Sequence, residues 1–272
     1  MKIKAVVLSL IGTFLLTGLA FAGSYAPAAG QPGSTAIHMD DASFVAWATG
    51  IDLVRGPADI SKPEGALASY GTPDKALGKA VGSSYDVVSL GDGGVATLTF
   101  DAPIGNGDGD DFAVFENGFS DTFLELGFVE VSSDGDNFFR FDAVSETQTD
   151  TQVGGFGSVD TTNLYNLAGK YRQGFGTGFD LDELSGIGGL DIDNIGWVRI
   201  IDVVGSINDD YATYDSLGNK VNEPWKTPFG SSGFDLDALG VINQGSPVPV
   251  PAAVWLLGSG LVGLVGLRRK NS

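Results

Sequence analysis

The sequence predicts an all-β fold for most of this 272-residue chain, with the strands arranged in an antiparallel sandwich. The first indication is a series of short runs of β-forming residues joined by irregular connections, because βαβ units would instead alternate strands with helices. The second indication is the composition. The chain has 41 Gly, and its acids are 27 Asp against 7 Glu. Asp and Gly favour turns, whereas acidic helices favour Glu.

Five runs of residues predict strands. Residues 95–100 (VATLTF) place Ala, Leu and Phe on one face, which is the two-residue period of a half-buried strand. Residues 111–116 (DFAVFE) are rich in β-formers, as is typical of a strand covered on both faces. Residues 127–144 (GFVEVSSDGDNFFRFDAV) predict a hairpin whose Asp-Gly pair makes a tight turn. Residues 196–205 and 233–242 predict two more strands.

A short helix is expected near the start of the body. Phe44, Trp47 and Ala48 have helical spacing. They follow Asp40 and Asp41, either of which is a suitable N-terminal cap. The minor α-helical content of the predicted fold comes from this stretch.

The pentapeptide GFDLD occurs twice, beginning at Gly178 and at Gly233. A structural repeat would extend beyond five residues, but the flanking sequences differ. We therefore interpret the two copies as convergent chemistry, either at the start of a strand or at a metal site.

The N-terminal residues 1–22 have the pattern of a secretory signal peptide. Two lysines precede an apolar run, and Ala20 and Ala22 then form an A-x-A cleavage site before Gly23. We expect a signal helix here, with the Sec translocon and signal peptidase as partners. The folded body is then expected to span residues 23–245.

The C-terminal end has the pattern of a membrane anchor. Residues 252–267 are apolar or small, and they would form a helix about 24 Å long, a little shorter than the hydrocarbon core of a bilayer. Pro251 suits the first turn of such a helix. Arg268, Arg269 and Lys270 would remain in the cytoplasm, so the body would lie outside. An ordinary transmembrane anchor is one interpretation of this segment.

The tail, residues 246–272, also resembles the PEP-CTERM sorting signal, in its VPLPA variant with Val250 where Leu is usual. The three parts of that signal, a Pro-containing signature, a glycine-bearing apolar segment and a basic cluster, occur in the same order here. The resemblance implies cleavage by an exosortase, a membrane protease of Gram-negative bacteria that make exopolysaccharide. It assigns the recognition signature to Val248, Pro249, Val250 and Pro251. The implied product is a precursor anchored in the inner membrane and then released to the cell surface or biofilm matrix.

The body resembles an uncharacterised family of bacterial cell-surface proteins, over roughly residues 25–243. Stretches such as GDGDDFAVFENGF and YATYDSLGNKVNEPWKTPF carry the resemblance. It implies a jelly-roll-like sandwich similar to galactose-binding modules. It implies no catalytic residue.

Composition excludes several kinds of function. The body contains all 34 acids and 10 of the 15 basic residues, a net charge near −24, which repels nucleic acids. Cysteine is absent and His38 is the only histidine. Cysteine nucleophiles, histidine-based triads and thiolate or multi-histidine zinc sites are therefore excluded.

Clustered acids are candidate ligands for Ca²⁺, which prefers oxygen donors. The Gly-rich loop at residues 106–117 departs from the EF-hand pattern at its sixth and twelfth positions, so a calcium site would be of another kind. The alternative is that these carboxylates are simply solvated. The candidate metal ligands are Asp108, Asp110, Asp111, Glu116, Asp235 and Asp237.

Aromatic residues suggest a glycan site. Tyr211, Tyr214 and Trp225 lie in a predicted long loop, where exposed rings can stack on a sugar beside Asp and Asn side chains. Alternatively, these rings hold the loop in place.

The sequence therefore predicts a non-enzymatic surface or matrix protein that binds exopolysaccharide and is stabilised by calcium. One alternative is a secreted carbohydrate-active enzyme that uses two carboxylates from among Glu116, Glu125 and Glu130. Another is a structural component of the biofilm with no specific ligand.

Overall fold

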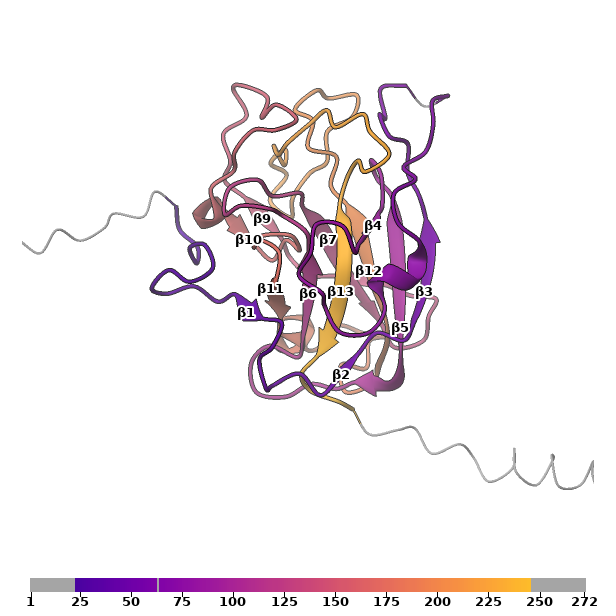
Figure 1. The fold of residues 1–272 in the computed structure, drawn as a ribbon. Helices are drawn as coiled ribbons and strands as arrows, with labels where there is room; N and C mark the ends of the chain where they lie inside the picture. The colour runs from indigo at the N-terminus through magenta and orange to yellow at the C-terminus, as the bar shows by residue number, and fades with distance from the viewer. Residues whose placement is uncertain (1–22, 63, 246–272) are drawn as a thin grey trace, which may run out of the picture.

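The computed structural model describes residues 23–62 and 64–245. The predictions for the signal peptide and the sorting tail lie outside these residues. Within the described part of the chain, the structure is built from antiparallel strands and three short 3₁₀ helices (Figure 1). No helix there is long and apolar enough to cross a bilayer. The predicted all-β class is confirmed.

The larger sheet has six strands in the order β1-β11-β6-β13-β2, and β4 also pairs with β13. Its pairs are all antiparallel. The strands are β1 (Ile37–His38), β2 (Ala46–Trp47), β4 (Val88–Ser89), β6 (Phe112–Glu116), β11 (Phe175–Phe179) and β13 (Asp235–Val241).

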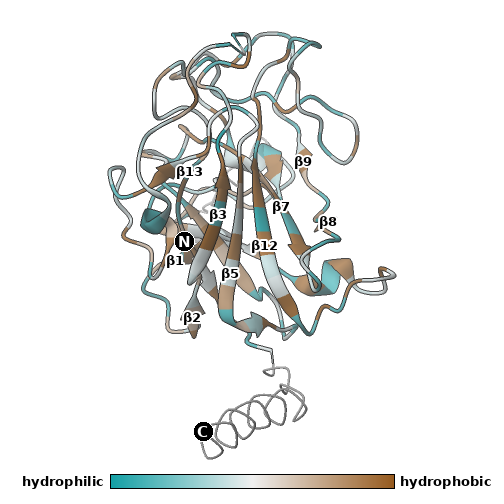
Figure 2. Ribbon diagram, turned by 90° about the vertical axis from the view of Figure 1, so that its right-hand side faces the viewer, coloured by the Kyte–Doolittle hydropathy of each residue, from teal (hydrophilic) through white to brown (hydrophobic). Residues whose placement is uncertain are grey.

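The second sheet has five strands in the order β3-β5-β12-β7-β8, and Figure 2 shows β3, β5, β12 and β7 side by side. The strands are β3 (Gly50–Val54), β5 (Val95–Ile104), β7 (Gly127–Ser132), β8 (Phe139–Arg140) and β12 (Ile195–Asp202). The remaining elements are the pair β9 (Val144–Ser145) and β10 (Leu164–Tyr165) and the helices η1 (Pro73–Ala76), η2 (Thr161–Asn163) and η3 (Leu181–Leu184).

The two sheets enclose one main apolar core. Val114 and Leu239 enter it from the six-stranded sheet, and Leu98, Val131 and Val198 enter it from the five-stranded sheet. All five side chains are at most 1% exposed. Because each sheet is apolar on the face that meets the other, burial of these faces stabilises the fold by about 25 cal/mol for each Å² removed from water.

The strand predictions are confirmed at β5, β6, β12 and β13. In β5 the two-residue period is visible in burial, since Ala96 and Leu98 are fully buried. Every residue of β6 is buried, as expected for a strand covered on both faces.

The predicted helix is absent, and its residues cover the outer face of β6 instead. Phe44 and Trp47 each lie with their ring centroids 5.6 Å from that of Phe115. Trp47 belongs to β2, which pairs with the end of β13. The helical spacing of the apolar residues was therefore misleading, because packing against Phe115 and pairing with β13 outweigh a weak local helical preference.

The hairpin prediction is half correct. Strands β7 and β8 pair as expected, with Glu130 opposite Arg140, but six residues connect them rather than a two-residue turn. The Asp134 carboxylate accepts hydrogen bonds from the main-chain N–H groups of Asp136 and Asn137. Gly135 takes a φ of 81°. Side-chain bonding of this kind stabilises a wider loop.

The central strands β6 and β13 run in opposite directions, so they define two ends of the molecule. At one end, here called the loop end, β6 finishes at Glu116 and β13 begins at Asp235. This end lies at the top of Figure 1, beneath the long loops. At the other end, here called the exit end, β13 finishes at Val241, and the described chain continues to Gly245.

At the exit end, Asp111 ties three segments together. Its carboxylate accepts hydrogen bonds from the N–H groups of Gly107 and Leu181, each at 2.8 Å, and from Nδ2 of Asn243 at 2.9 Å. Asp111 itself is fully buried. The carboxylate thereby satisfies donors from the loop before β6, from η3 and from the segment after β13.

We expect Asp111→Ala to lower the free energy of unfolding by about 2–4 kcal/mol, because it leaves buried donors without an acceptor. Urea denaturation of the purified protein measures this change. The matched control is Asp108→Ala, since Asp108 is exposed in the same loop, and it should leave stability unchanged. Equal losses in both variants would contradict the role assigned to Asp111.

Candidate functional site

A groove of about 370 Å³ lies at the loop end. We call it the aromatic groove. Its walls come from segments that are far apart in the sequence, and they meet because β6 and β13 are paired. The lining residues are Tyr70, Ser84, Tyr85, Asn117, Phe119, Ser231 and Asp235.

Three aromatic rings form the walls of the aromatic groove. Tyr85 is 82% exposed and Phe119 is 57% exposed, so both rings are free to contact a ligand. The hydroxyl of Tyr70 donates to the main-chain oxygen of Tyr85 at 3.0 Å, which joins two of the walls. Phe119 stacks on Phe123 with ring centroids 4.3 Å apart, so its position is also fixed.

The floor of the aromatic groove is polar. Asn117 donates from Nδ2 to Oδ2 of Asp235 at 2.8 Å and to the main-chain oxygen of Ser84 at 3.3 Å. The hydroxyl of Ser89 donates to the other carboxylate oxygen of Asp235. The Oδ1 atom of Asn117 is buried and has no hydrogen-bond partner among the described residues. A carboxylate and an amide are thus held together beneath exposed rings.

Arg55 holds the segments behind the groove together. Its guanidinium donates to three main-chain oxygens, those of Tyr70, Ser89 and Gly71, at 3.0, 3.1 and 2.6 Å. Burial lowers the pKa of Arg55, and the negative charge of Asp235 opposes that shift. Arg55 therefore positions Tyr70 in the wall and, through Ser89, the carboxylate in the floor.

Behind the floor lies a group of buried acids that we call the carboxylate cluster. Its members are at most 5% exposed. Burial is the largest cause that raises the pKa of every member. Nearby carboxylates raise it further for all members except Asp235. Burial raises the pKa of Asp235 to about 7. The cluster consists of Glu116, Glu125, Asp202, Glu223 and Asp235.

The other predicted metal ligands have different surroundings. Asp108 is exposed and Asp111 is engaged by three donors, as described above. Burial and the charges of Asp180, Asp111 and Glu183 raise the pKa of Asp110 to about 6. Within the described ranges, no group of three or more Asp, Glu or His side chains is already arranged around a metal position. Calcium binding in this loop stays a prediction.

The carboxylates of Asp237 and Asp235 have different hydrogen-bond partners and do not converge on one position. The Asp237 carboxylate accepts from the N–H groups of Val81 and Gly82, at 3.0 and 2.9 Å. The β6–β13 register shifts between Leu236 and Ala238, which interrupts the regular alternation of side chains along β13. The two carboxylates therefore bind different segments.

The predicted glycan-binding residues fall into two places. The rings of Tyr211 and Trp225 have centroids 6.1 Å apart, and the indole N–H of Trp225 donates to buried Asp92 at 3.3 Å. Tyr214 instead lines a separate, mainly polar groove with Glu146. Glycan binding by these three residues stays a prediction, and the groove that Tyr214 lines contains neither Tyr211 nor Trp225.

Of the three glutamates considered as a catalytic pair, two lie in the carboxylate cluster. Glu116 and Glu125 are 1% and 5% exposed, and neither lines the aromatic groove. Glu130 lies on β7 of the five-stranded sheet, where it forms ion pairs with Arg140 at 2.9 Å and with Arg199 at 3.3 Å. The structure thus separates Glu130 from the other two.

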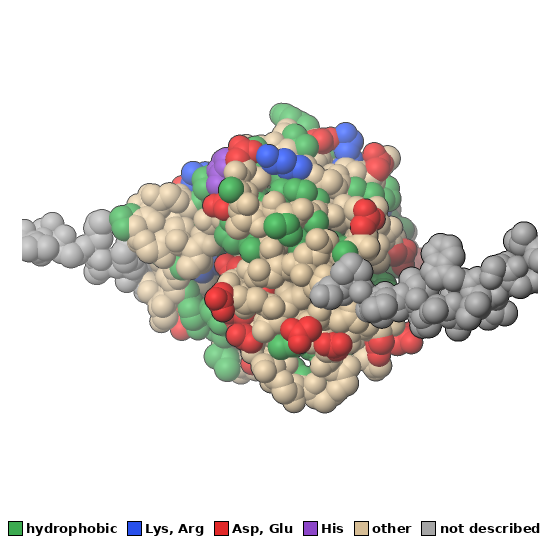
Figure 3. Space-filling view, turned by 90° about the horizontal axis from the view of Figure 1, so that it is seen from below, with side chains coloured by type: hydrophobic (Ala, Val, Ile, Leu, Met, Phe, Trp, Pro, Cys, Tyr) green, Lys and Arg blue, Asp and Glu red, His purple; other side chains and the backbone are tan. Residues whose placement is uncertain are grey.

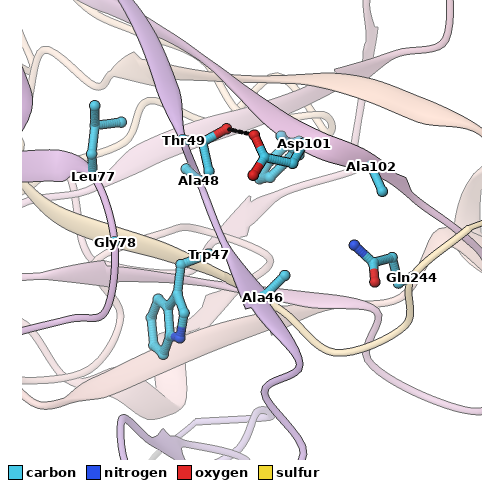
Figure 4. Close-up of a pocket in the computed structure, with 10 residues that line it drawn as sticks. Ala46, Trp47, Ala48, Thr49, Leu77, Gly78, Asp101, Ala102 and Gln244 are labelled. Carbon is cyan, nitrogen blue, oxygen red and sulfur yellow. Dashed lines mark hydrogen bonds between the residues drawn. The ribbon is translucent and has the colours of Figure 1, made fainter. Parts of the chain in front are cut away.

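A second groove, of about 500 Å³, lies at the exit end (Figure 4). Thr49 already donates to Asp101 at 3.0 Å, and the Trp47 ring packs on Phe44 and Phe115. Figure 3 views the molecule from this end, and acidic side chains are spread over much of the face. Two of its polar side chains, Thr49 and Asp101, are thus bonded to each other, so it is the weaker candidate.

Sequence reasoning missed the rings of the aromatic groove. Tyr85 and Phe119 follow short Gly- and Ser-containing stretches, GSSY and ENGF, and an aromatic residue in such a loop is a signal of exposure that could have been used. No local signal marks Arg55. Asp202 does carry one, since it is a charged residue between the apolar pairs Ile200–Ile201 and Val203–Val204 at the end of β12.

The chain was also compared with known proteins. No protein-family model, no curated protein and no solved structure matches it. Function is therefore argued from the geometry of the loop end.

We expect Arg55→Ala to lower the free energy of unfolding by about 2 kcal/mol, because three main-chain oxygens lose a charged donor. Thermal and urea unfolding measure the loss. Lys79→Ala is the control, since its ion pair with Asp40 is at the surface and should contribute less than about 1 kcal/mol. A smaller loss for Arg55→Ala than for the control would exclude the structural role of Arg55.

Proposed function

We propose that this chain is an exported cell-surface or matrix protein that binds a polysaccharide in the aromatic groove and does not cleave it. The observation that carries the proposal is the composition of the groove, three aromatic rings above a carboxylate and an amide. Aromatic faces stack on the apolar faces of sugars, and carboxylate and amide groups accept and donate hydrogen bonds to hydroxyls. The net charge of the body disfavours anionic polymers, so the expected ligand is a neutral polysaccharide.

The position of the groove supports a role at a surface. The groove lies where β13 begins, and the chain continues towards the proposed sorting tail from the other end of that strand. The seven residues of β13 separate these two ends by roughly 20 Å. A precursor anchored through its C-terminal segment would therefore present the groove away from the bilayer.

The finer fold assignment belongs to the same proposal. Two facing antiparallel sheets with functional residues at one end are compatible with a jelly-roll-like sandwich, as the resemblance of the body implies. In such folds, loops at the end of the sheets commonly carry binding residues.

We expect Tyr85→Ala and Phe119→Ala each to weaken polysaccharide binding about tenfold, which corresponds to about 1.4 kcal/mol. Tyr85 is 82% exposed, so Tyr85→Ala should leave the melting temperature unchanged, whereas Phe119→Ala loses its stacking on Phe123 and should melt slightly lower. Binding is measured by affinity electrophoresis against a panel of neutral bacterial polysaccharides. Tyr214→Ala, in the separate polar groove, is the matched control.

Two outcomes would count against this assignment. Loss of binding in Tyr214→Ala or Trp225→Ala, with normal binding in the Tyr85 and Phe119 variants, would move the site to the long loop. Release of reducing sugar during incubation would favour the alternative of a carbohydrate-active enzyme.

Sorting is tested by the mass of the released protein. Exosortase processing at residues 248–251 predicts a mature protein that has lost residues 252–272 as well as residues 1–22. Mass spectrometry of the protein recovered from the cell surface and the medium measures this directly. A released protein that retains residues 255–267 would contradict the sorting proposal and leave an ordinary anchor.

A further inference from the structure

The outer face of the five-stranded sheet, opposite the core, is open to solvent. In β5, Leu98 is fully buried whereas its neighbour Thr97 is half-buried. In β12, Val198 is fully buried whereas Arg199 is half-buried, and Asp52 in β3 is exposed. Each of these strands therefore turns apolar side chains to the core and polar side chains outwards.

A groove of about 410 Å³ lies on this outer face. We call it the sheet-face groove. It is separate from the aromatic groove, because its walls come from β3, β5, β12 and the connection between β7 and β8. The residues that line it include Asp52, Thr97, Thr99, Phe138, Trp197 and Arg199.

Strand pairing places polar side chains of the sheet-face groove in one row. Asp52 of β3 lies opposite Thr97 of β5, and Thr97 lies opposite Arg199 of β12. Asp52 and Arg199 are two strands apart, so their backbones are separated by roughly 10 Å. A carboxylate and a guanidinium thus stand on either side of a hydroxyl.

This row has hydrogen-bonding capacity that the described residues do not use. Neither a hydrogen bond nor an ion pair from the described part of the chain engages the side chains of Asp52 and Thr97. Arg199 donates from Nη1 to Glu130 at 3.3 Å, which leaves other donors of its guanidinium unused. An acceptor, a hydroxyl and a donor are therefore available to a ligand.

Two aromatic rings border the row, and both are held in place. The guanidinium carbon of Arg199 lies 3.4 Å from the centroid of the Phe138 ring. Gly135, which also lines the groove, packs on the indole of Trp197, since a Cβ at this glycine would lie 3.1 Å from two atoms of the ring. Trp197 is half-buried, so part of its ring remains open to the groove.

We propose that the sheet-face groove is a second binding site for a neutral polysaccharide. A sugar ring stacks on Trp197, and its hydroxyls bond to Asp52, Thr97 and Arg199. A hydroxyl both donates and accepts, so it is complementary to a carboxylate and to a guanidinium in the same groove. The opposite charges of Asp52 and Arg199 favour a neutral ligand, and the net charge of the body disfavours an anionic one.

Other occupants of the sheet-face groove fit less well. An apolar protein surface would leave its charged and hydroxyl groups without partners, which costs free energy. An anionic membrane is attracted by clusters of basic residues, whereas this groove is lined by one arginine, which is already paired with Glu130.

Two sites on one chain would allow this protein to cross-link polysaccharide chains. Cross-linking rests on the proposed function, because it needs the aromatic groove as the first site. Binding in the sheet-face groove does not, because the two grooves share no residue. If both sites hold the same chain, the second contact is intramolecular and raises the overall affinity.

The experiment measures retardation of the purified protein in native gels that contain dextran, pullulan, hydroxyethyl cellulose or galactomannan. The decisive variants are Asp52→Ala and Thr97→Val, made in the wild type and in Tyr85→Ala. In the Tyr85→Ala background, each should weaken the remaining binding about fivefold, because one hydrogen bond to the sugar is lost. Their melting temperatures should not change. Asp108→Ala, which alters an exposed acid outside both grooves, is the matched control.

Tryptophan fluorescence gives a second measurement. Stacking of a sugar on Trp197 should change the emission when the retarding polysaccharide is added, in the wild type and in Tyr85→Ala. Trp197→Phe should abolish this change, because the lining of the aromatic groove contains no tryptophan.

The outcomes separate this proposal from the proposed function. Wild-type binding by Asp52→Ala, Thr97→Val and Trp197→Phe, with loss of binding in Tyr85→Ala, would exclude the sheet-face site and leave the aromatic groove. Loss in the sheet-face variants, with normal binding by Tyr85→Ala and Phe119→Ala, would support the sheet-face site and count against the aromatic groove.

Two further results would overturn the sheet-face site. One is a wild-type protein that none of the four polysaccharides retards, a result that would also contradict the proposed function. The other is flotation of the wild type with phosphatidylcholine vesicles that is lost in Trp197→Phe, which would assign the face to a membrane surface.

Discussion

Strands β6 and β13 lie side by side in the middle of the six-stranded sheet, and every residue of both strands is buried. Their antiparallel pairing brings the end of one strand, at Glu116, next to the beginning of the other, at Asp235. Main-chain hydrogen bonds must be satisfied inside the protein, so this register is strongly specified. The aromatic groove and the carboxylate cluster both depend on it. Each contains Asp235 from β13, together with Glu116 at the end of β6 in the cluster and Asn117 directly after β6 in the groove.

The abundance of Asp has a structural explanation that is separate from metal binding. Cysteine is absent, and the long loops have little regular structure to bind their N–H groups. Buried Asp side chains take that role. Asp111, Asp202 and Asp237 each accept main-chain N–H bonds from two segments or two successive residues. A short side chain with two acceptor oxygens suits this task, because it loses little conformational entropy when it is fixed.

Glu116 stands apart from this arrangement, since its Oε2 accepts one hydrogen bond and its Oε1 is buried without a partner among the described residues. The next residue, Asn117, lines the groove and donates to Asp235, which belongs both to the groove and to the carboxylate cluster. Arg55 holds the wall of the groove through the main-chain oxygen of Tyr70. Stability at the loop end and the shape of the groove are thereby linked through the same few residues.

The sequence by itself determined the all-β class and most of the long strands, because a two-residue period and a fully apolar run depend only on which faces a strand buries. Tertiary structure decided the rest. The stretch containing Phe44 and Trp47 covers β6 rather than forming a helix. The two GFDLD copies diverge, since the first ends β11 and leads into η3, with Asp180 as its cap, whereas the second begins β13. The aromatic groove is lined by residues of separate loops, among them Tyr70, Tyr85, Asn117 and Ser231. Local sequence carries no information about which distant loop will lie opposite, because that is set by the pairing of strands and the burial of their shared core.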